Sequence, residues 1–370
     1  MLPTKDQLEA KLYGSLKPIT EMSAVIGLLP KKTLQLKKPK YWKLYDYVYV
    51  IGYTGLYLFF TVYTLYYLYI NEMTQDIIPK EILVYASSIA LMQTMIFPCV
   101  GFRFRHMITR TIRQMVDIDY ALRMMEISID YGKNYRDNII ILCSIAISII
   151  LRAIFSANTI KLDVIQQVTL VVAVYMMSLV KFQYVAPVNC VLDRFRAINR
   201  KLKTRCTGYE MNKLCKLHFR LCHCLRLLNT AFGCQIFISV SCSFIRFLFQ
   251  LYFLYNLLTK RQDTTSAFKF GTPIFYIITE IVEIYMLVNV CAKTKRTAEK
   301  TPIIIHALRA KFEFTQDEDA NIYTHSLEML HQLVEFAPLG IFHLDYYLIY
   351  QMVMAASAYA IVYIQYDISR

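Results

Sequence analysis

Charged side chains inside long apolar blocks are the residues of this chain that could do chemistry. Arg246 lies midway through one such block, and Glu280 and Glu283 lie in the next. The two glutamates are three residues apart, so they share one face of a helix. Ionised groups are costly in apolar surroundings unless they pair or line a cavity. Two interpretations stay open: the three residues line a ligand pocket, or they form an internal ion pair that orders the protein.

Rings and amides accompany these charges on the same two blocks. A mostly apolar pocket with a few polar groups is the usual form of a small-molecule site. We therefore predict a ligand pocket built from Arg246, Gln250, Tyr252, Tyr276, Glu280 and Glu283. Two more cations, Arg152 and Lys181, lie late in earlier blocks. Because Lys181 falls near the predicted cytoplasmic end of its block, we expect its side chain to extend to the membrane surface.

The last apolar block carries a single amide, Gln365. An unpaired amide in hydrocarbon is unfavourable, so Gln365 should face protein or water. Met354, Ala358, Ile361 and Gln365 follow one another at i, i+4, i+7 and i+11, on one helix face. An apolar face with one amide can close a pore by excluding water. The same spacing also suits packing against neighbouring helices.

The composition indicates a membrane protein. The 370 residues are 56% hydrophobic and 18% charged, whereas soluble domains carry about 25% charged residues. A soluble bundle would show polar stripes at every helical turn, and these blocks do not. The first residues include Asp6 and no apolar core, so we expect no cleaved signal peptide.

Apolar blocks of spanning length, about 20 residues each, occur about seven times. We predict an all-α membrane protein with seven transmembrane helices over 44–70, 81–101, 139–157, 165–187, 233–259, 272–292 and 344–365. The segment 102–138 should be helical too, because Ile108, Ile112, Met115 and Ile118 recur at helical spacing. The organisation that follows is a cytoplasmic segment 1–43, a six-helix bundle 44–292, a cytoplasmic segment 293–343 and a last helix 344–370.

Basic residues mark the cytoplasmic side. They gather before the first predicted span and after the second, fourth and sixth, while the alternate loops hold few. The positive-inside rule puts the N-terminus in the cytoplasm and, after seven spans, the C-terminus outside. This is the reverse of a G-protein-coupled receptor. The loops account for the net charge of +14, so we expect no nucleic-acid partner. No set of nucleophile and base stands out, which argues against an enzyme.

A group of sulfur and imidazole side chains resembles a metal site. Its members are Cys215, His218, Cys222, His223 and Cys224. They belong to an amphipathic helix with Leu214, Leu217 and Leu221, and a zinc-type spacing of four ligands is missing. We therefore expect no metal ion and no cofactor.

Three motifs, in order, resemble those of insect gustatory receptors. The first comprises Leu16-Lys17-Pro18-Ile19 and Ile26-Gly27-Leu28-Leu29-Pro30. The second, Leu339-Gly340-Ile341-Phe342-His343-Leu344-Asp345, resembles the family's Gly-x-Phe-x-x-Asp. The third resembles its closing motif of Thr-Tyr, five apolar residues and Gln-Phe. Tyr359, residues 360–364 and Gln365 match; Ala358 stands in for the Thr and Tyr366 for the Phe.

The resemblance implies a taste receptor of the plasma membrane that acts as a ligand-gated cation channel. Receptors of this family are tetramers, so we expect a homotetramer or a heteromer with related receptors. The ligand pocket would lie in the outer half of each subunit, and 293–343 would contribute to a shared cytoplasmic anchor. The last helix would line one central pore, with Ala358, Ile361, Gln365 and Tyr366 at its gate. The partners would be a small-molecule tastant and membrane lipid.

Two alternatives remain: an insect odorant receptor-like channel, and a secondary transporter. A transporter should show internal repeats or helices broken near the midplane, and we see neither. Sugar-sensing relatives tend to carry Glu where this chain has Ala360. This argues against that subgroup, although a fructose-type receptor need not carry the Glu. The ring-rich pocket favours a bitter compound and would also stack on sugars.

Overall fold

Helices make up nearly all of the described chain. The computed structural model describes residues 4–29, 42–70, 80–159, 164–204, 207–259, 267–309, 316–332 and 334–368, and no strand occurs in these ranges. The helices are α1 (Lys5–Val25), α2 (Trp42–Ile70), α3 (Lys80–Arg123), α4 (Tyr131–Thr159), α5 (Val164–Leu202), α6 (Gly208–Thr259), α7 (Ala267–Arg309), α8 (Gln316–His331) and α9 (Tyr346–Ile368), with a 3₁₀ turn at Pro338–Gly340. The all-α prediction is confirmed.

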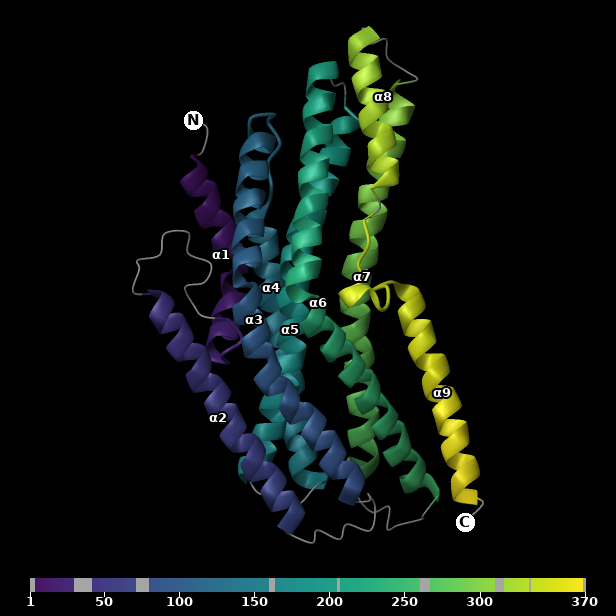
Figure 1. Ribbon diagram of the computed structural model, residues 1–370. Helices are drawn as coiled ribbons and strands as arrows, with labels where there is room; N and C mark the ends of the chain where they lie inside the picture. The colour runs from purple at the N-terminus through teal and green to yellow at the C-terminus, as the bar shows by residue number, and fades with distance from the viewer. Residues whose placement is uncertain are drawn as a thin grey trace.

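Five long helices, α3 to α7, form the central bundle (Figure 1). α1 packs on α3, α4 and α5 at the end where the chain starts, and α8 packs on α6 and α7 at the same end. α2 lies along α3 and α5 in the opposite half. Among the described residues α9 contacts only α6 and α7, and it stands at the edge of the bundle.

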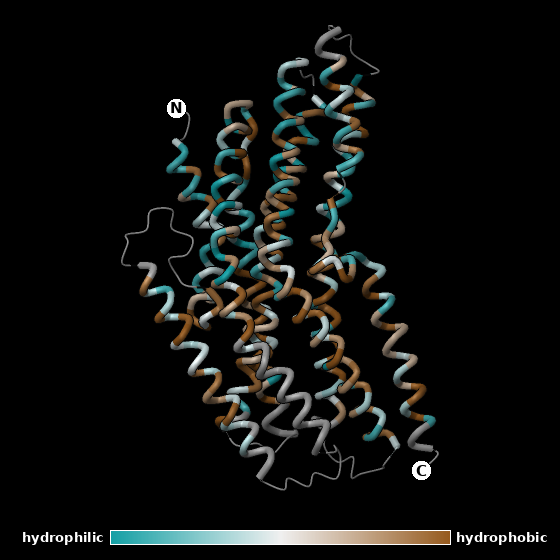
Figure 2. Tube along the Cα trace, in the orientation of Figure 1, coloured by the Kyte–Doolittle hydropathy of each residue, from teal (hydrophilic) through white to brown (hydrophobic). Residues whose placement is uncertain are grey.

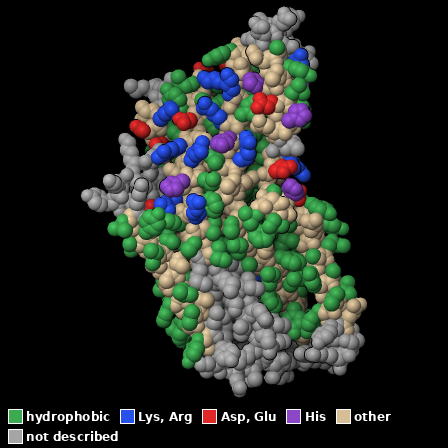
Figure 3. Space-filling model, in the orientation of Figure 1, with side chains coloured by type: hydrophobic (Ala, Val, Ile, Leu, Met, Phe, Trp, Pro, Cys, Tyr) green, Lys and Arg blue, Asp and Glu red, His purple; other side chains and the backbone are tan. Residues whose placement is uncertain are grey.

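The two halves of the bundle differ in polarity. Hydrophilic residues gather in the half that holds α1 and α8, and apolar residues dominate the other half (Figure 2). On the face shown in Figure 3, the charged side chains all lie in the first half, above an apolar surface. Such a division matches a cytoplasmic region joined to a membrane-spanning region.

Helix lengths explain how one bundle serves both regions. α6 has 52 residues, about 78 Å at 1.5 Å per residue, whereas a bilayer core is about 30 Å thick. Its first half, before the predicted span 233–259, therefore extends out of the membrane. α3 continues to Arg123, so the prediction of a helix beyond residue 101 is confirmed, with a turn at 124–130 before α4.

Five helices of the described chain are long and apolar enough to cross a membrane. These segments are Tyr131–Phe155, Gln167–Leu202, Gly208–Thr259, Phe270–Arg309 and Tyr346–Gln365. Each includes one predicted span, or nearly all of it. The predicted spans 44–70 and 81–101 lie within α2 and α3. The count of seven membrane crossings stays a prediction.

α1 and α2 are joined by three tyrosines. The last carbonyl groups around the end of α1 have no partner within that helix. Tyr49, Tyr53 and Tyr57 of α2 donate hydrogen bonds to the carbonyl oxygens of Ala24, Val25 and Ile26 respectively. Gly27 has a positive φ of 86°, and a Cβ there would lie 2.4 Å from the Tyr53 ring. The first family-like motif therefore contains the end of α1, and the tyrosine rings of α2 lie against it.

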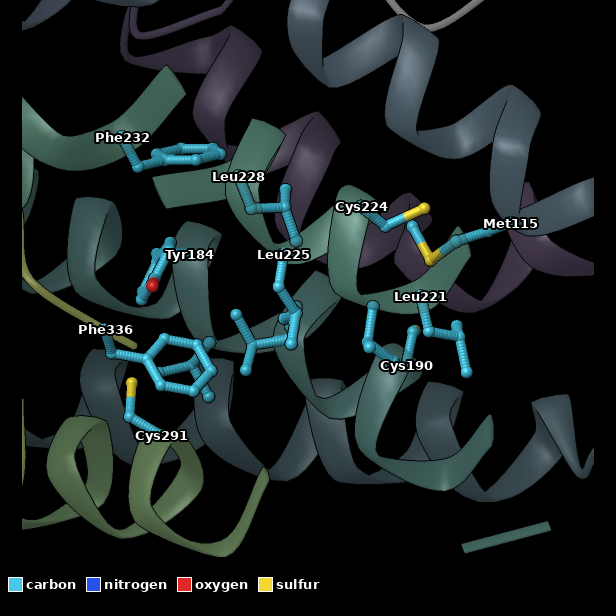
Figure 4. Close-up of a cluster of buried hydrophobic side chains, with 14 of the residues drawn as sticks. Met115, Tyr184, Cys190, Leu221, Cys224, Leu225, Leu228, Phe232, Cys291 and Phe336 are labelled. Atoms are coloured by element: carbon cyan, nitrogen blue, oxygen red, sulfur yellow. The ribbon is translucent and has the colours of Figure 1, made fainter. Parts of the chain in front are cut away.

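A buried ion pair orders the polar half of the bundle, which holds α1 and α8. Arg194 of α5 donates from Nε and Nη2 to the two carboxylate oxygens of Asp119 on α3, at 2.7 and 2.5 Å. The Tyr131 hydroxyl at the start of α4 donates to the same carboxylate at 2.6 Å. Nearby, Tyr184, Phe232, Cys291 and Phe336 meet in the core that joins α5, α6 and α7 (Figure 4).

The cysteine and histidine group lies on the first half of α6, and most of its members pack in the core. Cys215, His218 and Cys222 are buried, and no group of three or more His, Cys, Asp or Glu that could hold a metal ion occurs among the described residues. Burial raises the thiol pKa of Cys215 and of Cys222 to about 12. It lowers the pKa of His218, which contacts the rings of Phe195 and Phe219, to about 4. The two thiols therefore stay protonated and the imidazole stays neutral near pH 7.

His218 makes stability depend on pH. Its pKa is about 4 in the folded protein, against 6.5 for a histidine side chain in water, so only the unfolded chain gains this proton as the pH falls from 6.5 to 4. The folded protein should lose about 3 kcal/mol of stability over that range. We expect His218→Leu to remove this loss, measured as the melting temperature of the purified protein against pH. His343→Gln, at an exposed site, is the control. A variant that follows the wild-type pH profile would contradict the assignment.

Candidate functional site

Five ionisable side chains from four helices meet inside the apolar half. They are Arg152 of α4, Lys181 of α5, Arg246 of α6, and Glu280 and Glu283 of α7. All lie on helices apolar enough to span a membrane. We call these five residues the charge cluster. Its position follows from packing, because α7 lies against α4, α5 and α6.

Glu280 is the centre of the charge cluster and is only 2% exposed. Arg246 donates to its carboxylate from Nε at 3.0 Å and from Nη2 at 2.9 Å. Arg152 Nη1 lies 3.3 Å from the same carboxylate, and Lys181 Nζ lies 3.7 Å away. The Glu280 carboxylate therefore pairs with cations of three other helices, and these cations compensate for the burial of its charge.

Glu283 completes the cluster one helical turn further on. It accepts hydrogen bonds from Lys181 Nζ at 2.9 Å and from the Ser178 hydroxyl at 2.7 Å. Lys181 also donates to Ser243 at 2.7 Å. The expectation that Lys181 extends to the membrane surface is wrong: the residue is fully buried. The carboxylates of α7 stabilise its charge more than a partly hydrated position would.

The charge cluster is not neutral. It holds three cations and two carboxylates, which leaves one positive charge in excess. Arg246 is its most accessible member, with a side chain 19% exposed. Among the described residues, its Nη1 donates only to the thioether sulfur of Met177, a weak acceptor. Arg246 can therefore still donate to a stronger acceptor, such as a carbonyl, hydroxyl or carboxylate oxygen.

The predicted pocket residues divide between two places. Tyr276 lies at the charge cluster: its hydroxyl donates to the Arg152 carbonyl at 3.2 Å, and the Arg152 guanidinium lies 5.1 Å from its ring centre. Gln250 is half-buried one turn beyond Arg246. Tyr252 lies elsewhere, because its ring makes an edge contact with Tyr363 of α9 at 4.3 Å. It faces the last helix and not the charges.

α6 and α9 line an apolar cavity of about 330 Å³. Its walls are aliphatic and aromatic side chains of both helices, among them Phe249, Tyr252, Tyr255, Ala356, Tyr359, Ala360 and Tyr363. Sequence reasoning did not find this cavity, because its two walls are about 100 residues apart in the chain. In the sequence, only the aromatic residues of the two helices, spaced three or four positions apart, indicated it.

Met354 and the described gate residues, which the sequence places on one face of the last helix, are exposed on α9. Met354 is 53% and Ile361 56% exposed, and Ala358 and Gln365 are also exposed. Ala356, on the opposite face, is buried. The side chain of Tyr366 lies outside the described residues. The four described residues thus share a surface that nothing covers in the described part of one subunit.

The second family-like motif turns the chain into α9. Leu339 and Gly340 both have positive φ, and the Leu344 amide donates to the Phe336 carbonyl at 2.7 Å. The Asp345 carboxylate accepts from the amides of Tyr347 and Leu348, at 3.0 and 3.3 Å. It therefore caps the first turn of α9, where amides lack helical partners.

Sequence reasoning also missed how many groups join the cluster. Arg152 and Lys181 were noticed as cations inside apolar blocks but were not placed beside Glu280. Ser178, Ser243 and Thr279 supply hydroxyls to these charges. The excess of cations over carboxylates among intramembrane residues was the available indication, since each buried charge needs a partner.

Comparison with known proteins agrees with this architecture. A family described as 7tm chemosensory receptor matches residues 16–370. The insect olfactory receptor OR5 from Machilis hrabei superposes with a TM-score of 0.59 at 11% identity, over 95% of this chain and 97% of that chain. At that identity the likeness shows the fold alone.

Two Drosophila melanogaster proteins are similar in sequence over part of the chain. "Putative gustatory receptor 28b" is 22% identical over 155 residues, 41% of this chain and 33% of its own length. "Putative gustatory receptor 28a" is 26% identical over 163 residues, 43% of this chain and 36% of its own length. The matched region therefore spans about a third of each relative.

The excess positive charge predicts that removing a carboxylate harms the protein more than removing a cation. Glu283→Gln leaves three cations with one carboxylate and should cost about 3–5 kcal/mol. Lys181→Met leaves two of each and should cost clearly less. The double variant restores the wild-type excess and should be more stable than Glu283→Gln alone. Melting temperatures of the purified receptor test this ranking, with Lys293→Met at an exposed site as control. Equal losses in the two single variants would refute it.

Proposed function

Because this chain belongs to the 7tm chemosensory receptor family, we propose that it is a gustatory receptor that acts as a ligand-gated, non-selective cation channel of the plasma membrane. Each subunit would contribute α9 to one central pore of a tetramer, either a homotetramer or a heteromer with related receptors. A small-molecule tastant would open the pore. No catalytic step is part of this function.

The open face of α9 is the observation that carries the channel proposal. In the described part of the chain, α9 contacts only α6 and α7. Most of its surface is therefore left for lipid or for other subunits. The exposed residues Ala358, Ile361 and Gln365 combine aliphatic groups with one amide. Four such faces around an axis would form an apolar constriction with an amide ring, which can exclude ions by dewetting. Tyr366 follows at the predicted gate and would add a hydroxyl.

The charge cluster supports a ligand pocket next to α4, α5, α6 and α7. Arg246 offers an unused donor, Tyr276 a ring, and Gln250 an amide one turn away. A ligand with an aromatic body and an oxygen acceptor fits these groups, which favours a bitter compound. Glu280 would orient Arg246, with which it is paired. Glu283 is paired with Lys181 and would contribute to the pocket through the charge of the cluster.

Specific observations argue for or against two other functions. An odorant receptor-like channel shares the fold with OR5, but the spacing of Tyr359 and Gln365 and the similarity to Drosophila gustatory receptors favour taste. A secondary transporter should break its helices near the midplane. In the described chain α3, α5 and α7 stay helical through Pro98, Pro187 and Pro273.

The proposed topology has seven spans, a cytoplasmic N-terminus and an extracellular C-terminus. Segments 1–43 and 293–343 would lie in the cytoplasm, the latter as part of an anchor shared by the subunits. Epitope tags at both ends test this in intact cells. We expect antibody staining of the C-terminal tag without permeabilisation and of the N-terminal tag only after it. The reverse pattern would overturn the topology.

The gate residues give the sharpest test of the channel. Ile361→Ser would wet an apolar ring four times over, so we expect a several-fold larger current without ligand in expressing cells. Gln365→Ala should change ion selectivity or basal opening. Val362→Ser makes a similar change at the same depth, about 100° around the helix, and should leave the basal current unchanged.

A panel of bitter compounds and sugars, applied to cells that express the receptor alone, tests the function as a whole. We expect a cation current only with ligand. Uptake of a substrate without such a current would support the transporter instead. If Ile361→Ser and Val362→Ser behave alike while both reach the cell surface, α9 does not line the pore.

A further inference from the structure

A basic cavity lies in the cytoplasmic half, far from the charge cluster. Its volume is about 780 Å³, and three elements enclose it: the turn before α4 with the first turn of α4, the last turns of α5, and the middle of the cytoplasmic part of α7. The size is that of an ordinary small-molecule site. None of its lining residues is used by the proposed gate or ligand pocket.

Three elements supply the cations. Arg196 and Arg200 lie at i and i+4 on one face of α5, and Lys203 follows directly after the last residue of α5, Leu202. Lys300 faces them from α7, and Lys133 from α4. These five cations accompany only two carboxylates, those of Asp130 and Asp193. The cavity therefore carries an excess of three positive charges.

Both carboxylates are already engaged. Asp130 accepts from the Lys133 amide at 3.0 Å and so caps the start of α4. Asp193 pairs with Arg196 at 3.2 Å and with Lys133 at 3.9 Å. Arg200, Lys203 and Lys300 have no acidic partner within 4 Å among the described residues, and all three are exposed. Three cations around one hollow repel one another unless an anion joins them.

Cations near a cytoplasmic helix end have simpler uses. They complement the negative end of the dipole of α5 and set the orientation in the membrane. Neither use requires a cation from α7 and another from α4 to face the same hollow. The convergence of three elements on one cavity is what points to a ligand.

We propose that this cavity binds a multiply phosphorylated anion and that the bound anion joins α4, α5 and α7 in the cytoplasmic half. The cations from Arg196 to Lys203 span about two helical turns at the end of α5, which suits several phosphates on one ring or chain better than a single phosphate. Arginine forks and lysine ammonium groups are the usual partners of phosphate oxygens.

Two sources share this chemistry: a soluble polyphosphate, such as an inositol polyphosphate or a nucleoside triphosphate, and a phosphoinositide headgroup. Arg200 lies 13 residues beyond Pro187, the last residue of the predicted span, so it stands about 20 Å along α5 from the membrane core. Headgroup regions extend only about 5–8 Å from that core. The geometry thus favours the soluble source, and the experiment separates the two.

The test measures binding of inositol hexakisphosphate to the purified full-length receptor in nanodiscs of phosphatidylcholine. The cavity variant combines Arg200→Gln, Lys203→Gln and Lys300→Gln. The control variant combines Lys11→Gln, Arg123→Gln and Lys216→Gln, three exposed cations on α1, α3 and α6 outside the cavity. Both variants lose three charges, so non-specific attraction falls equally. Elution from size exclusion and the melting temperature without ligand check the fold.

We expect the wild type to bind, and the ligand to raise its melting temperature. The cavity variant should bind at least about tenfold more weakly, since it loses three charge-assisted contacts, and the control should bind like the wild type. Inorganic phosphate at the same concentration should not compete. If the triple variant misfolds, the pair Lys203→Gln and Lys300→Gln should still weaken binding while Lys11→Gln with Lys216→Gln does not.

Nanodiscs that also carry phosphatidylinositol bisphosphate distinguish the sources. Loss of hexakisphosphate binding there would identify a lipid headgroup as the occupant, and unchanged binding would identify the soluble anion. Absence of wild-type binding to both, or equal weakening in cavity and control variants, would overturn the proposal. These measurements need no channel current, so their outcome is separate from that of the proposed function.

Discussion

The ion pairs of Glu280 and Glu283 are the interaction on which the membrane half depends. A carboxylate in an apolar bundle is tolerated only with cations beside it, and here the cations come from α4, α5 and α6. Each pair fixes the rotation and depth of its helix against α7. Apolar packing alone would allow such helices to slide, since one aliphatic contact resembles the next. The charges therefore specify one arrangement of the four helices. They also place Arg246 where it can still donate a hydrogen bond to a further partner.

The outer helices are held at their ends. Tyrosines of α2 cap the carbonyl groups at the end of α1, and Asp345 caps the first amides of α9. The loop before α9 is in turn held by the core, because the Asn229 amide donates to the Glu335 carbonyl at 2.6 Å and Tyr184 donates to Asn229. α9 is thus fixed at its start and little covered along its length. A helix held in this way can tilt about its first turn, which suits a moving gate.

The polar and apolar halves of the bundle are joined because the same helices cross both. α5, α6 and α7 run from the charge cluster to the Arg194–Asp119 pair and the core around Phe232 without a break among their described residues. The basic cavity and the charge cluster both contact α5 and α7.

The sequence by itself determined the class of the protein. Apolar blocks of spanning length, basic loops and three motifs were local features, and the helices, the family and the extension of α3 beyond residue 101 followed from them. Tertiary structure alone decided which polar groups meet. Lys181 was expected at the membrane surface and Tyr252 beside Arg246, but Lys181 pairs with Glu283 and Tyr252 packs on Tyr363. The reason is physical: helical spacing says which residues share a face, whereas the partner of that face depends on how helices far apart in the chain pack together.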